Sequence, residues 1–237
     1  MTEPYIPRIS IITPVLNEED MITPFLDHLA LLREPFELVI VDGGSSDATC
    51  ALIQQYASPF PAPLHLLSAP AGRSGQMNTG AAAAQAEILL FLHVDCRIPA
   101  DSLQVITRVC TEQGVCGGAF THRFGEPGLF HAVIGLLVNT CTKYTRTFFG
   151  DSGIFVQRDV FFQAGGFELI PFCEDLEFCH SARKHGRMKQ INLVIRSSPR
   201  RFRRIGRVKL TAVYMLAIVL NRAGIRPLFL KQYIVDR

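Results

Sequence analysis

The chain has 237 residues, of which 48% are hydrophobic and 19% charged, and its formal net charge is +3. This length can bury a core as one large domain or as two closely packed halves, and the composition excludes a disordered chain. A net charge of +3 is too small to indicate general nucleic-acid binding.

Four short apolar runs in the first hundred residues predict buried strands at 9–12, 38–41, 64–67 and 88–92. Helix-length segments lie between them, around 18–32, 47–57 and 74–85. Strands that alternate with helices predict an α/β fold with a parallel sheet covered on both faces. Each strand is followed by a turn-rich cluster, at 13–14, 42–46, 69–72 and 93–95. Because ligands bind outside the carboxyl ends of such strands, we expect these clusters to share one crevice.

After residue 100 the pattern predicts helices at 101–113, 127–144 and 174–185, and strands at 115–123 and 153–156. No Pro-rich linker, internal repeat or low-complexity tract interrupts the chain. We therefore predict one domain over residues 1–207, with halves at about 8–95 and 96–207. A helical tail follows over 208–237.

The seven cysteines contain no pair with the C-x-x-C spacing of zinc sites and redox motifs. They are typical of reduced, mostly buried thiols, so we expect a cytoplasmic protein. The N-terminus lacks the basic and apolar segments of a signal peptide. The apolar run at 210–220 has 11 residues, where a membrane span needs roughly 20. We expect neither secretion nor membrane spanning, and peripheral attachment to the inner face of the cell membrane stays open.

Two strand ends carry side chains that can bind ligands. Asp42 precedes Gly43 and Gly44, where a carboxylate can accept hydrogen bonds from a nucleobase or ribose, or simply cap the turn. His93 and Asp95 lie two positions apart on an extended segment, so both side chains could face one ion. A divalent cation held by carboxylates commonly bridges substrate phosphates. The alternative is a packed histidine beside a solvated aspartate.

Two further segments are predicted helix starts whose residues could take part in catalysis or ligand binding. Glu174 and Asp175 open a predicted helix, where the helix dipole favours carboxylates and where one of them could serve as a general base. Gly72 and Arg73 lead into an Ala-rich helix, which suits an anion at a helix N-terminus. That segment matches neither the phosphate-loop pattern nor the dinucleotide-binding pattern.

Four motifs in chain order resemble family 2 glycosyltransferases of the GT-A fold, over roughly residues 8–205. They are TPVLNEE at 13–19, DGGSSD at 42–47, FLHVD at 91–95 and ED at 174–175. The phrases FLHVD, GDSGIFVQRDVF, GGF and EDLEF also resemble a bacterial branch called radical-SAM/selenodomain-associated transferase 2. The resemblance implies a Rossmann-like nucleotide-binding half with a mixed, mainly parallel sheet, followed by an acceptor and catalytic half.

The resemblance also implies an activity of the hexosyltransferase type, in which a sugar moves from a nucleoside-diphosphate sugar to the hydroxyl of a glycan, lipid or small molecule with inversion. Asp175 matches the catalytic base, with Glu174 beside it. The positions implied to bind the donor are Pro14, Leu16, Glu18, Asp42, Gly72, Arg73, Asn78, His93 and Asp95. Those implied to border the acceptor and the donor sugar are Gly150, Asp151 and Ser152.

One position departs from the family pattern. The first aspartate of the D-x-D metal motif is His93 here, and one carboxylate fewer weakens a site for a hard cation. We expect a divalent cation, Mn²⁺ or Mg²⁺, to be bound by Asp95, with His93 as the second candidate ligand.

Seven basic residues fall within the 14 residues 196–209, directly before the apolar stretch at 210–220. This basic segment has three interpretations: a solvated charged stretch, a group of arginines that contacts the donor diphosphate, or part of an amphipathic helix on an anionic membrane. Arg201, Arg203 and Arg204 are the candidates for diphosphate or membrane contact. The apolar helix could also pair with its copy in a homodimer.

Three other functions fit the sequence less well. A nucleotidyltransferase normally carries a Gly-rich loop directly after the first strand, whereas residues 13–17 contain no glycine. A catalytically silent nucleotide-sugar-binding protein is disfavoured because both Asp95 and Asp175 are present. A nucleic-acid-binding role for the basic segment is disfavoured because Phe202 is its one aromatic residue and the chain has no tryptophan.

Overall fold

The computed structural model describes residues 7–125, 128–223 and 225–233, without the side chains of Arg201, Arg207 and Arg222. Its strands are β1 (Ile9–Val15), β2 (Phe36–Asp42), β3 (Leu64–Ser68), β4 (Ile88–Phe91), β5 (Cys96–Arg97), β6 (Val115–Phe124), β7 (Ile154–Gln157) and β8 (Arg187–Ser197). Its helices are α1 (Glu19–Leu29), α2 (Thr49–Ala57), α3 (Arg73–Ala83), α4 (Ser102–Cys110), α5 (Leu129–Thr145), α6 (Arg158–Gln163), α7 (Glu174–Ala182), α8 (Arg200–Ile205) and α9 (Arg207–Arg222), with 3₁₀ turns η1 (Gly150–Ser152) and η2 (Leu228–Tyr233).

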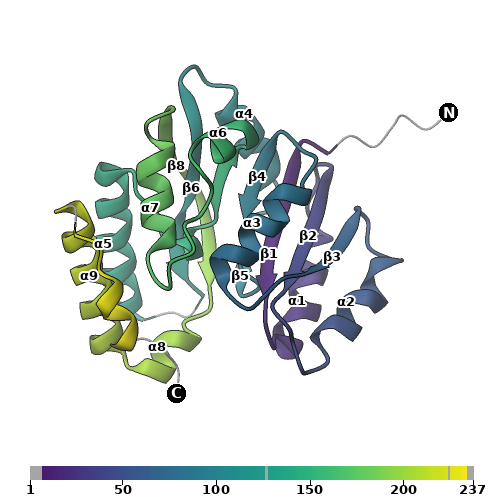
Figure 1. Cartoon of the computed structure of the whole chain (residues 1–237), viewed down its shortest axis with the longest axis horizontal. Helices are drawn as coiled ribbons and strands as arrows, with labels where there is room; N and C mark the ends of the chain where they lie inside the picture. Colours follow the sequence, from purple (N-terminus) through teal and green to yellow (C-terminus); the bar gives the residue numbers. More distant parts are fainter. Residues whose placement is uncertain (1–6, 126–127, 224, 234–237) are drawn as a thin grey trace.

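The strands form one sheet in the order β3-β2-β1-β4-β7-β6-β8-β5, with helices on both faces (Figure 1). The first four strands are mutually parallel, because β1 pairs with β2 and β4 and β2 pairs with β3. The second half is mixed: β7 is antiparallel to β4 and β6, β6 and β8 are parallel, and β5 is antiparallel to β8. The predicted α/β class and mainly parallel sheet are confirmed.

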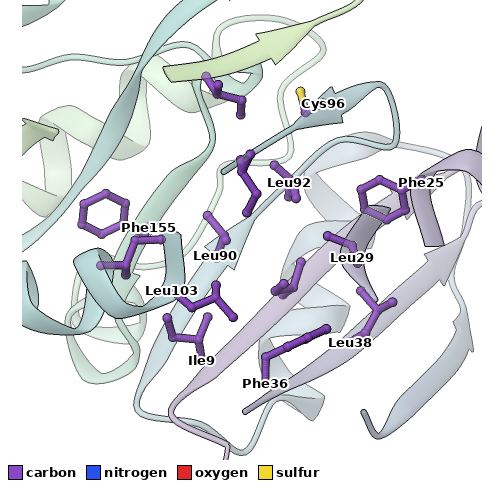
Figure 2. Close-up of a cluster of buried hydrophobic side chains, with 14 of the residues drawn as sticks. Ile9, Phe25, Leu29, Phe36, Leu38, Leu90, Leu92, Cys96, Leu103 and Phe155 are labelled. Carbon is purple, nitrogen blue, oxygen red and sulfur yellow. The ribbon is translucent and has the colours of Figure 1, made fainter. Parts of the chain in front are cut away.

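One face of the sheet packs against α1, α2 and α4. Leu38 of β2 and Leu90 of β4 lie in one buried cluster with Phe25 and Leu29 of α1 and Leu103 of α4 (Figure 2). All five side chains are fully buried. Because consecutive strand residues face opposite sides, the near-continuous apolar runs supply a core to both faces.

The other face packs against α3, α6 and α7. Val39 of β2 and Leu89 of β4 point to this side and join Met77 of α3, Phe161 of α6 and Phe178 of α7. Helix α7 is therefore anchored in the core, and its N-terminus, which carries the Glu-Asp pair, has a fixed position relative to the sheet.

A third, smaller apolar cluster attaches the C-terminal helix. Val213 and Ala217 of α9 and Leu230 of η2 pack on Phe172 and Leu176, which lie directly around the start of α7. Helix α9 thus contacts the segment that carries the candidate catalytic pair. The boundary after residue 207 and the division into functional halves stay predictions.

Most predicted elements lie within a few residues of their expected bounds. Sequence reasoning missed β5, β8, α6 and α8. All seven cysteines are described and free of disulfide bonds, and five of them are buried. In the described part of the chain, no helix is both long enough and apolar enough to span a bilayer.

Candidate active site

A cavity of about 430 Å³ lies at the carboxyl ends of β1 and β4. It brings together segments that are far apart in the chain: the loop after β1, the start of α3, the segment after β4, η1 and the start of α7. The predicted site residues that line it are Pro14, Leu16, Glu18, Gly72, Arg73, His93, Asp95, Gly150, Asp151 and Asp175. Three of the four turn-rich clusters, at 13–14, 69–72 and 93–95, contribute residues to this cavity as expected. The cluster at 42–46 does not.

Asp175 lines this cavity although its residue is only 5% exposed. Its Oδ2 atom accepts a hydrogen bond from the Gly150 amide at 2.6 Å, and its Oδ1 atom accepts one from the Leu176 amide at 2.8 Å. Burial, and then the negative charge of Glu174, raise the pKa of Asp175 to about 7, against the opposing effect of Arg73 and the two amides. Such a carboxylate can exchange a proton near neutral pH.

Glu174 has a different role in the same pair. It is buried and accepts hydrogen bonds from the guanidinium of Arg73, at the start of α3. Burial by itself lowers the pKa of Arg73, but the carboxylates of Glu174 and Asp175 raise it overall. Cys173, the residue before the pair, has a left-handed backbone with φ of 64°, which non-glycine residues adopt at a cost. In the helix that follows, Glu174 contacts Arg73 and Asp175 contacts the Gly150 amide.

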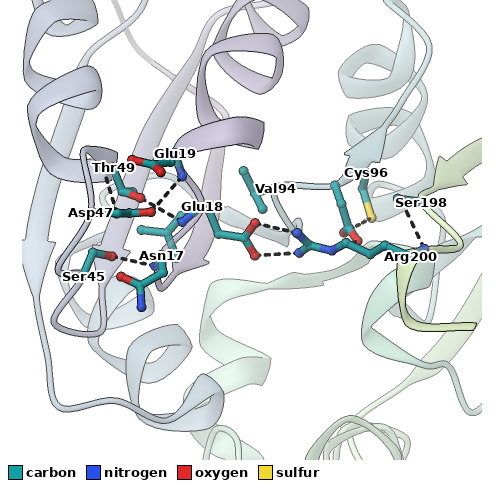
Figure 3. Close-up of polar contacts among 12 residues, drawn as sticks. Asn17, Glu18, Glu19, Ser45, Asp47, Thr49, Val94, Cys96, Ser198 and Arg200 are labelled. Atoms are coloured by element: carbon teal, nitrogen blue, oxygen red, sulfur yellow. Dashed lines mark hydrogen bonds and ion pairs between the residues drawn. The ribbon is translucent and has the colours of Figure 1, made fainter. Parts of the chain in front are cut away.

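A second cluster of charges, formed by Glu18, Asp95 and Arg200, also lines the cavity, and Figure 3 shows Arg200 facing Glu18. Both terminal nitrogens of Arg200 donate to the Glu18 carboxylate, each at 2.6 Å, and Arg200 Nε lies 3.3 Å from Asp95 Oδ2. Burial raises the pKa of Asp95, Arg200 lowers it, and Asp151 and Glu18 raise it again, so that the net direction is upward. The guanidinium therefore serves as the counter-charge of two partly buried carboxylates.

The loop that carries Glu18 is fixed by the start of α2 (Figure 3). The Glu18 amide donates to Thr49 Oγ1 at 2.8 Å, and the Asn17 amide donates to Ser45 Oγ at 2.9 Å. Asn17 has a positive φ of 51°, and its side-chain oxygen accepts a hydrogen bond from the Ser46 amide. The first two motifs, at 13–19 and 42–47, thus form one interlocked pair of loops.

Asp42 and Asn78 do not line the cavity. The Asp42 carboxylate accepts hydrogen bonds from the Gly44 amide at 2.9 Å and from the Ser45 amide at 3.0 Å. Burial raises its pKa, but these hydrogen bonds and that of the Ser45 hydroxyl lower it overall. Asn78 exchanges two hydrogen bonds with the backbone of Phe167. Both side chains therefore shape loops that border the site.

His93 and Gly150 approach each other closely in the cavity wall. A Cβ atom at position 150 would lie 2.9 Å from His93 Nε2, so a side chain there would displace the histidine. Asp151, the next residue, lies 3.5 Å from Nε2 of the buried His122. Ser152 is buried and does not line the cavity. Gly150 thus lies between His93, which follows β4, and Asp175 of α7.

The sequence matches the family described as "Glycosyl transferase family 2" over residues 10–172, which is more than half of the chain. The chain belongs to glycosyl transferase family 2. The match ends two residues before Glu174 and therefore includes three of the four motifs. The assignment of the fourth motif, Glu174-Asp175, rests on the cavity geometry described above.

Family 2 relatives cover different shares of the chain. An undecaprenyl-phosphate 4-deoxy-4-formamido-L-arabinose transferase from Yersinia enterocolitica is 25% identical over 156 residues, 62% of this chain and 47% of that protein. Glycosyltransferase AglE from Haloferax volcanii is 24% identical over 243 residues, with 90% and 80% coverage. The chain spans less than half the length of the Yersinia relative.

The fold of the family is confirmed by solved structures. The mannosyltransferase PcManGT from Pyrobaculum calidifontis, solved with GDP-Man and Mn²⁺, superposes with a TM-score of 0.71 at 23% identity, covering 97% of this chain and 69% of that one. The expected GT-A architecture is therefore present.

Arg200 is the site residue that sequence reasoning missed most clearly. Arg203 and Arg204 are exposed on α8 and do not line the cavity, and the side chain of Arg201 lies outside the described residues. Gln76 was also missed: its side-chain amide donates to the carbonyls of Val15 and Val41 at 2.8 Å each and ties the ends of β1 and β2 to α3. The basic segment was the available signal for Arg200, but its partners lie far away in the sequence.

Proposed function

We propose that this protein transfers a sugar from a nucleoside-diphosphate sugar to an acceptor hydroxyl, with inversion at the anomeric carbon. The observation that carries the proposal is the buried Asp175, whose pKa is raised to about 7 and which faces the same cavity as Asp95 and Glu18. The narrower likeness to the radical-SAM/selenodomain-associated transferase 2 branch belongs to this proposal. The likeness to a glycosyltransferase and to a mannosyltransferase supports it.

In the proposed reaction the acceptor oxygen attacks the anomeric carbon from the side opposite the diphosphate. The bond from that carbon to the diphosphate oxygen breaks, and the nucleoside diphosphate leaves with the electron pair. The acceptor proton passes to the carboxylate of Asp175, which the Gly150 amide holds in place. Arg73 neutralises Glu174. The three residues Arg73, Glu174 and Asp175 together therefore carry one net negative charge when Asp175 is ionised.

Asp95 fits a divalent cation, and His93, which lines the same cavity, stays the second candidate ligand. Asp95 is a carboxylate with a raised pKa, and it already lies beside a cationic group, Arg200, which fills the place of a counter-ion. In the described residues no three His, Cys, Asp or Glu side chains converge into a complete metal site, so diphosphate oxygens and water would complete the shell. When bound, the ion would offset the negative charge that develops on the leaving diphosphate.

The activity is expected to depend on the ionisation of Asp175. A general base works only when ionised, so kcat/KM should rise with pH, reach its midpoint near pH 7 and level off above it. The midpoint lies this high because burial of the Asp175 carboxyl and the negative charge of Glu174 raise its pKa. A steady-state pH profile from 5.5 to 9 measures this, and a kcat/KM that is constant down to pH 5.5 would remove Asp175 from the role of base.

Replacing Arg200 by glutamine is expected to tighten the binding of free Mn²⁺ by about 3–30-fold, because the change removes a positive charge beside Glu18 and Asp95. Calorimetric titration of the metal alone measures the effect. Arg196, an exposed arginine of β8, provides the matched control, and R196Q should leave Mn²⁺ affinity unchanged. Equal or weaker Mn²⁺ binding by R200Q would mean that Arg200 does not occupy the cation position.

The proposal as a whole is tested by calorimetric binding of UDP, GDP, CDP and dTDP, each with and without Mn²⁺. Metal-dependent preference for one nucleotide would support the function and define the donor class. Binding of none of them would contradict it. Binding without turnover of any donor sugar would favour the catalytically silent alternative. Homodimer formation through α9 stays a separate prediction.

A further inference from the structure

The active-site cavity has two chemically different ends. The charged end contains Asp175 and the Arg200 cluster described above. The apolar end is lined by Ile134 and Val138 of α5 and by Thr211, Tyr214 and Met215 of α9. A sugar diphosphate is strongly polar and does not need such surroundings. The apolar end is therefore available for the acceptor.

Aromatic rings stiffen the apolar end. The ring of Tyr214 lies 5.5 Å from that of Phe149, 6.4 Å from that of Phe172 and 6.3 Å from that of Phe202, measured between centroids. Phe202 in turn lies 5.0 Å from Phe124. All five rings line the cavity, and their mutual contacts form a continuous aromatic wall that starts close to Asp175.

A second, smaller cavity shares one wall residue with the main cavity. This cavity of about 210 Å³ is also lined by Phe149 and by residues of α5, α7 and α9, and its lining is mixed, with Leu176 and Ile218 beside polar residues such as Thr142, His180 and Arg183. Residues of α5 and α9 therefore border both cavities, and Phe149 separates them. We name the space between these helices the α5–α9 groove. The aliphatic side chains of Ile134, Val138 and Met215 that line its part in the main cavity suit a hydrocarbon chain better than a sugar.

The outer surface of the same helices is also apolar. Val133 and Leu137 of α5 are 46% and 45% exposed, Leu129 and Leu136 are 83% and 68% exposed, and Val219 of α9 is 60% exposed. Exposed aliphatic side chains that gather on two neighbouring helices mark an interaction surface. Figure 1 shows α5, α8 and α9 together at one end of the molecule, away from β3 and α2.

Basic side chains accompany this surface. Arg203 and Arg204 of α8 and Lys209 of α9 are exposed. An apolar surface accompanied by basic side chains complements the interface of an anionic bilayer, where aliphatic side chains enter the acyl region and basic ones contact headgroups. The charge distribution therefore favours a lipid surface over a soluble apolar partner.

We propose that the acceptor is an amphipathic lipid drawn from an anionic bilayer, with its hydroxyl at Asp175 and its hydrocarbon chain in the α5–α9 groove. This rests on the proposed function, because it assigns the second substrate of the same site. The lipid oxygen forms the new bond to the anomeric carbon, its proton goes to Asp175, and the nucleoside diphosphate leaves. The outer faces of α5 and α9 rest on the bilayer during this step.

The first test is calorimetric titration with alkyl β-glucosides of one, four and eight carbons, below their micelle concentrations. Octyl glucoside should bind about 10–200-fold more tightly than butyl glucoside, because four more methylene groups are buried. Ile134→Gln, which places an amide in the groove, should remove most of this gain. Ala132→Gln, on the exposed side of the same helix, should not. Equal affinity for the three glucosides, or an equal loss of octyl glucoside affinity in both variants, would show that the hydrocarbon chain does not bind in the α5–α9 groove.

The second test distinguishes a bilayer lipid from a soluble apolar acceptor. The protein should sediment with phosphatidylglycerol vesicles at low salt and much less with phosphatidylcholine vesicles. Leu129→Asp combined with Leu136→Asp should lower vesicle binding about tenfold or more, because two charges enter the apolar surface, while octyl glucoside affinity is unchanged. Binding of octyl glucoside without any vesicle binding overturns the bilayer as the source.

Failure of this inference and failure of the proposed function give different results. Nucleotide binding with Mn²⁺ is measured on the same samples. If nucleotides bind and the glucosides show no chain-length dependence, the lipid acceptor is wrong and the glycosyltransferase site stands. If no nucleotide binds, the proposed function itself is wrong.

Discussion

Replacing Asp175 by asparagine is expected to lower turnover by about 10²–10⁴-fold while the affinity for the nucleotide changes by less than about twofold. An amide has nearly the shape of the carboxyl group but cannot take up the acceptor proton. Its oxygen can still accept one of the two backbone hydrogen bonds, from Gly150 or from Leu176, so the local structure is retained. Turnover is measured as nucleoside diphosphate release and affinity by calorimetry.

Asp159 provides the control for this substitution. It is an exposed carboxylate of α6 outside the cavity, and Asp159→Asn should leave turnover unchanged. A D175N variant with nearly full turnover would exclude Asp175 as the base. Loss of nucleotide binding in D175N would instead place this carboxylate in donor binding.

Replacing Asp95 by asparagine is expected to remove the metal-dependent part of donor binding, with a loss of affinity of about 10²-fold in the presence of Mn²⁺. The amide keeps the size of the side chain but no longer supplies a charged ligand to a hard cation. Without Mn²⁺, the variant and the wild type should bind the nucleotide about equally. Calorimetric titrations with and without the metal measure both quantities.

The matched control is Asp101→Asn, at the exposed start of α4, which should keep the full metal effect. If D95N binds nucleotide with an undiminished Mn²⁺ dependence, the ion is held elsewhere. His93 would then be the next ligand to substitute, and the D-x-D correspondence at FLHVD would be wrong.

The first half of the fold could be predicted because its signals are local. The strands β1, β2 and β4 are almost continuously apolar, which is typical of parallel strands covered on both faces. Their carboxyl ends lie at one edge of the sheet as a consequence of parallel pairing. For that reason Pro14 and Asp95 could be assigned to one crevice from their positions at the ends of β1 and β4, whereas Glu18 was implied by the family resemblance.

The position of Arg200 could not be predicted because it depends on pairing between distant segments. β5 has only two residues, and Cys96 pairs with Ser197 of β8 in antiparallel register. The Ser198 amide also donates to the carbonyl of Asp95 at 3.2 Å. These contacts bring the basic segment to Asp95, and a two-residue strand has no periodicity that a sequence could reveal.

β8 was missed for a related reason. Its side chains are buried at uneven intervals, as in Met188, Ile191 and Ile195, because it pairs irregularly with β6 around two register shifts. Alternation with period two is the signal that predicts a half-buried strand, and the bulges disrupt it. The aromatic wall was equally hidden, since its rings come from five separate segments of the chain.

Diffraction data collected at the manganese edge, from crystals grown with Mn²⁺ and the nucleoside diphosphate that binds best, would test the active-site assignment most directly. We predict an anomalous peak about 2.0–2.3 Å from an Asp95 carboxylate oxygen, with the diphosphate on the same ion and the base over the loops at 13–19 and 42–47. A nucleotide ordered outside this cavity, or a manganese peak away from Asp95, would contradict the account.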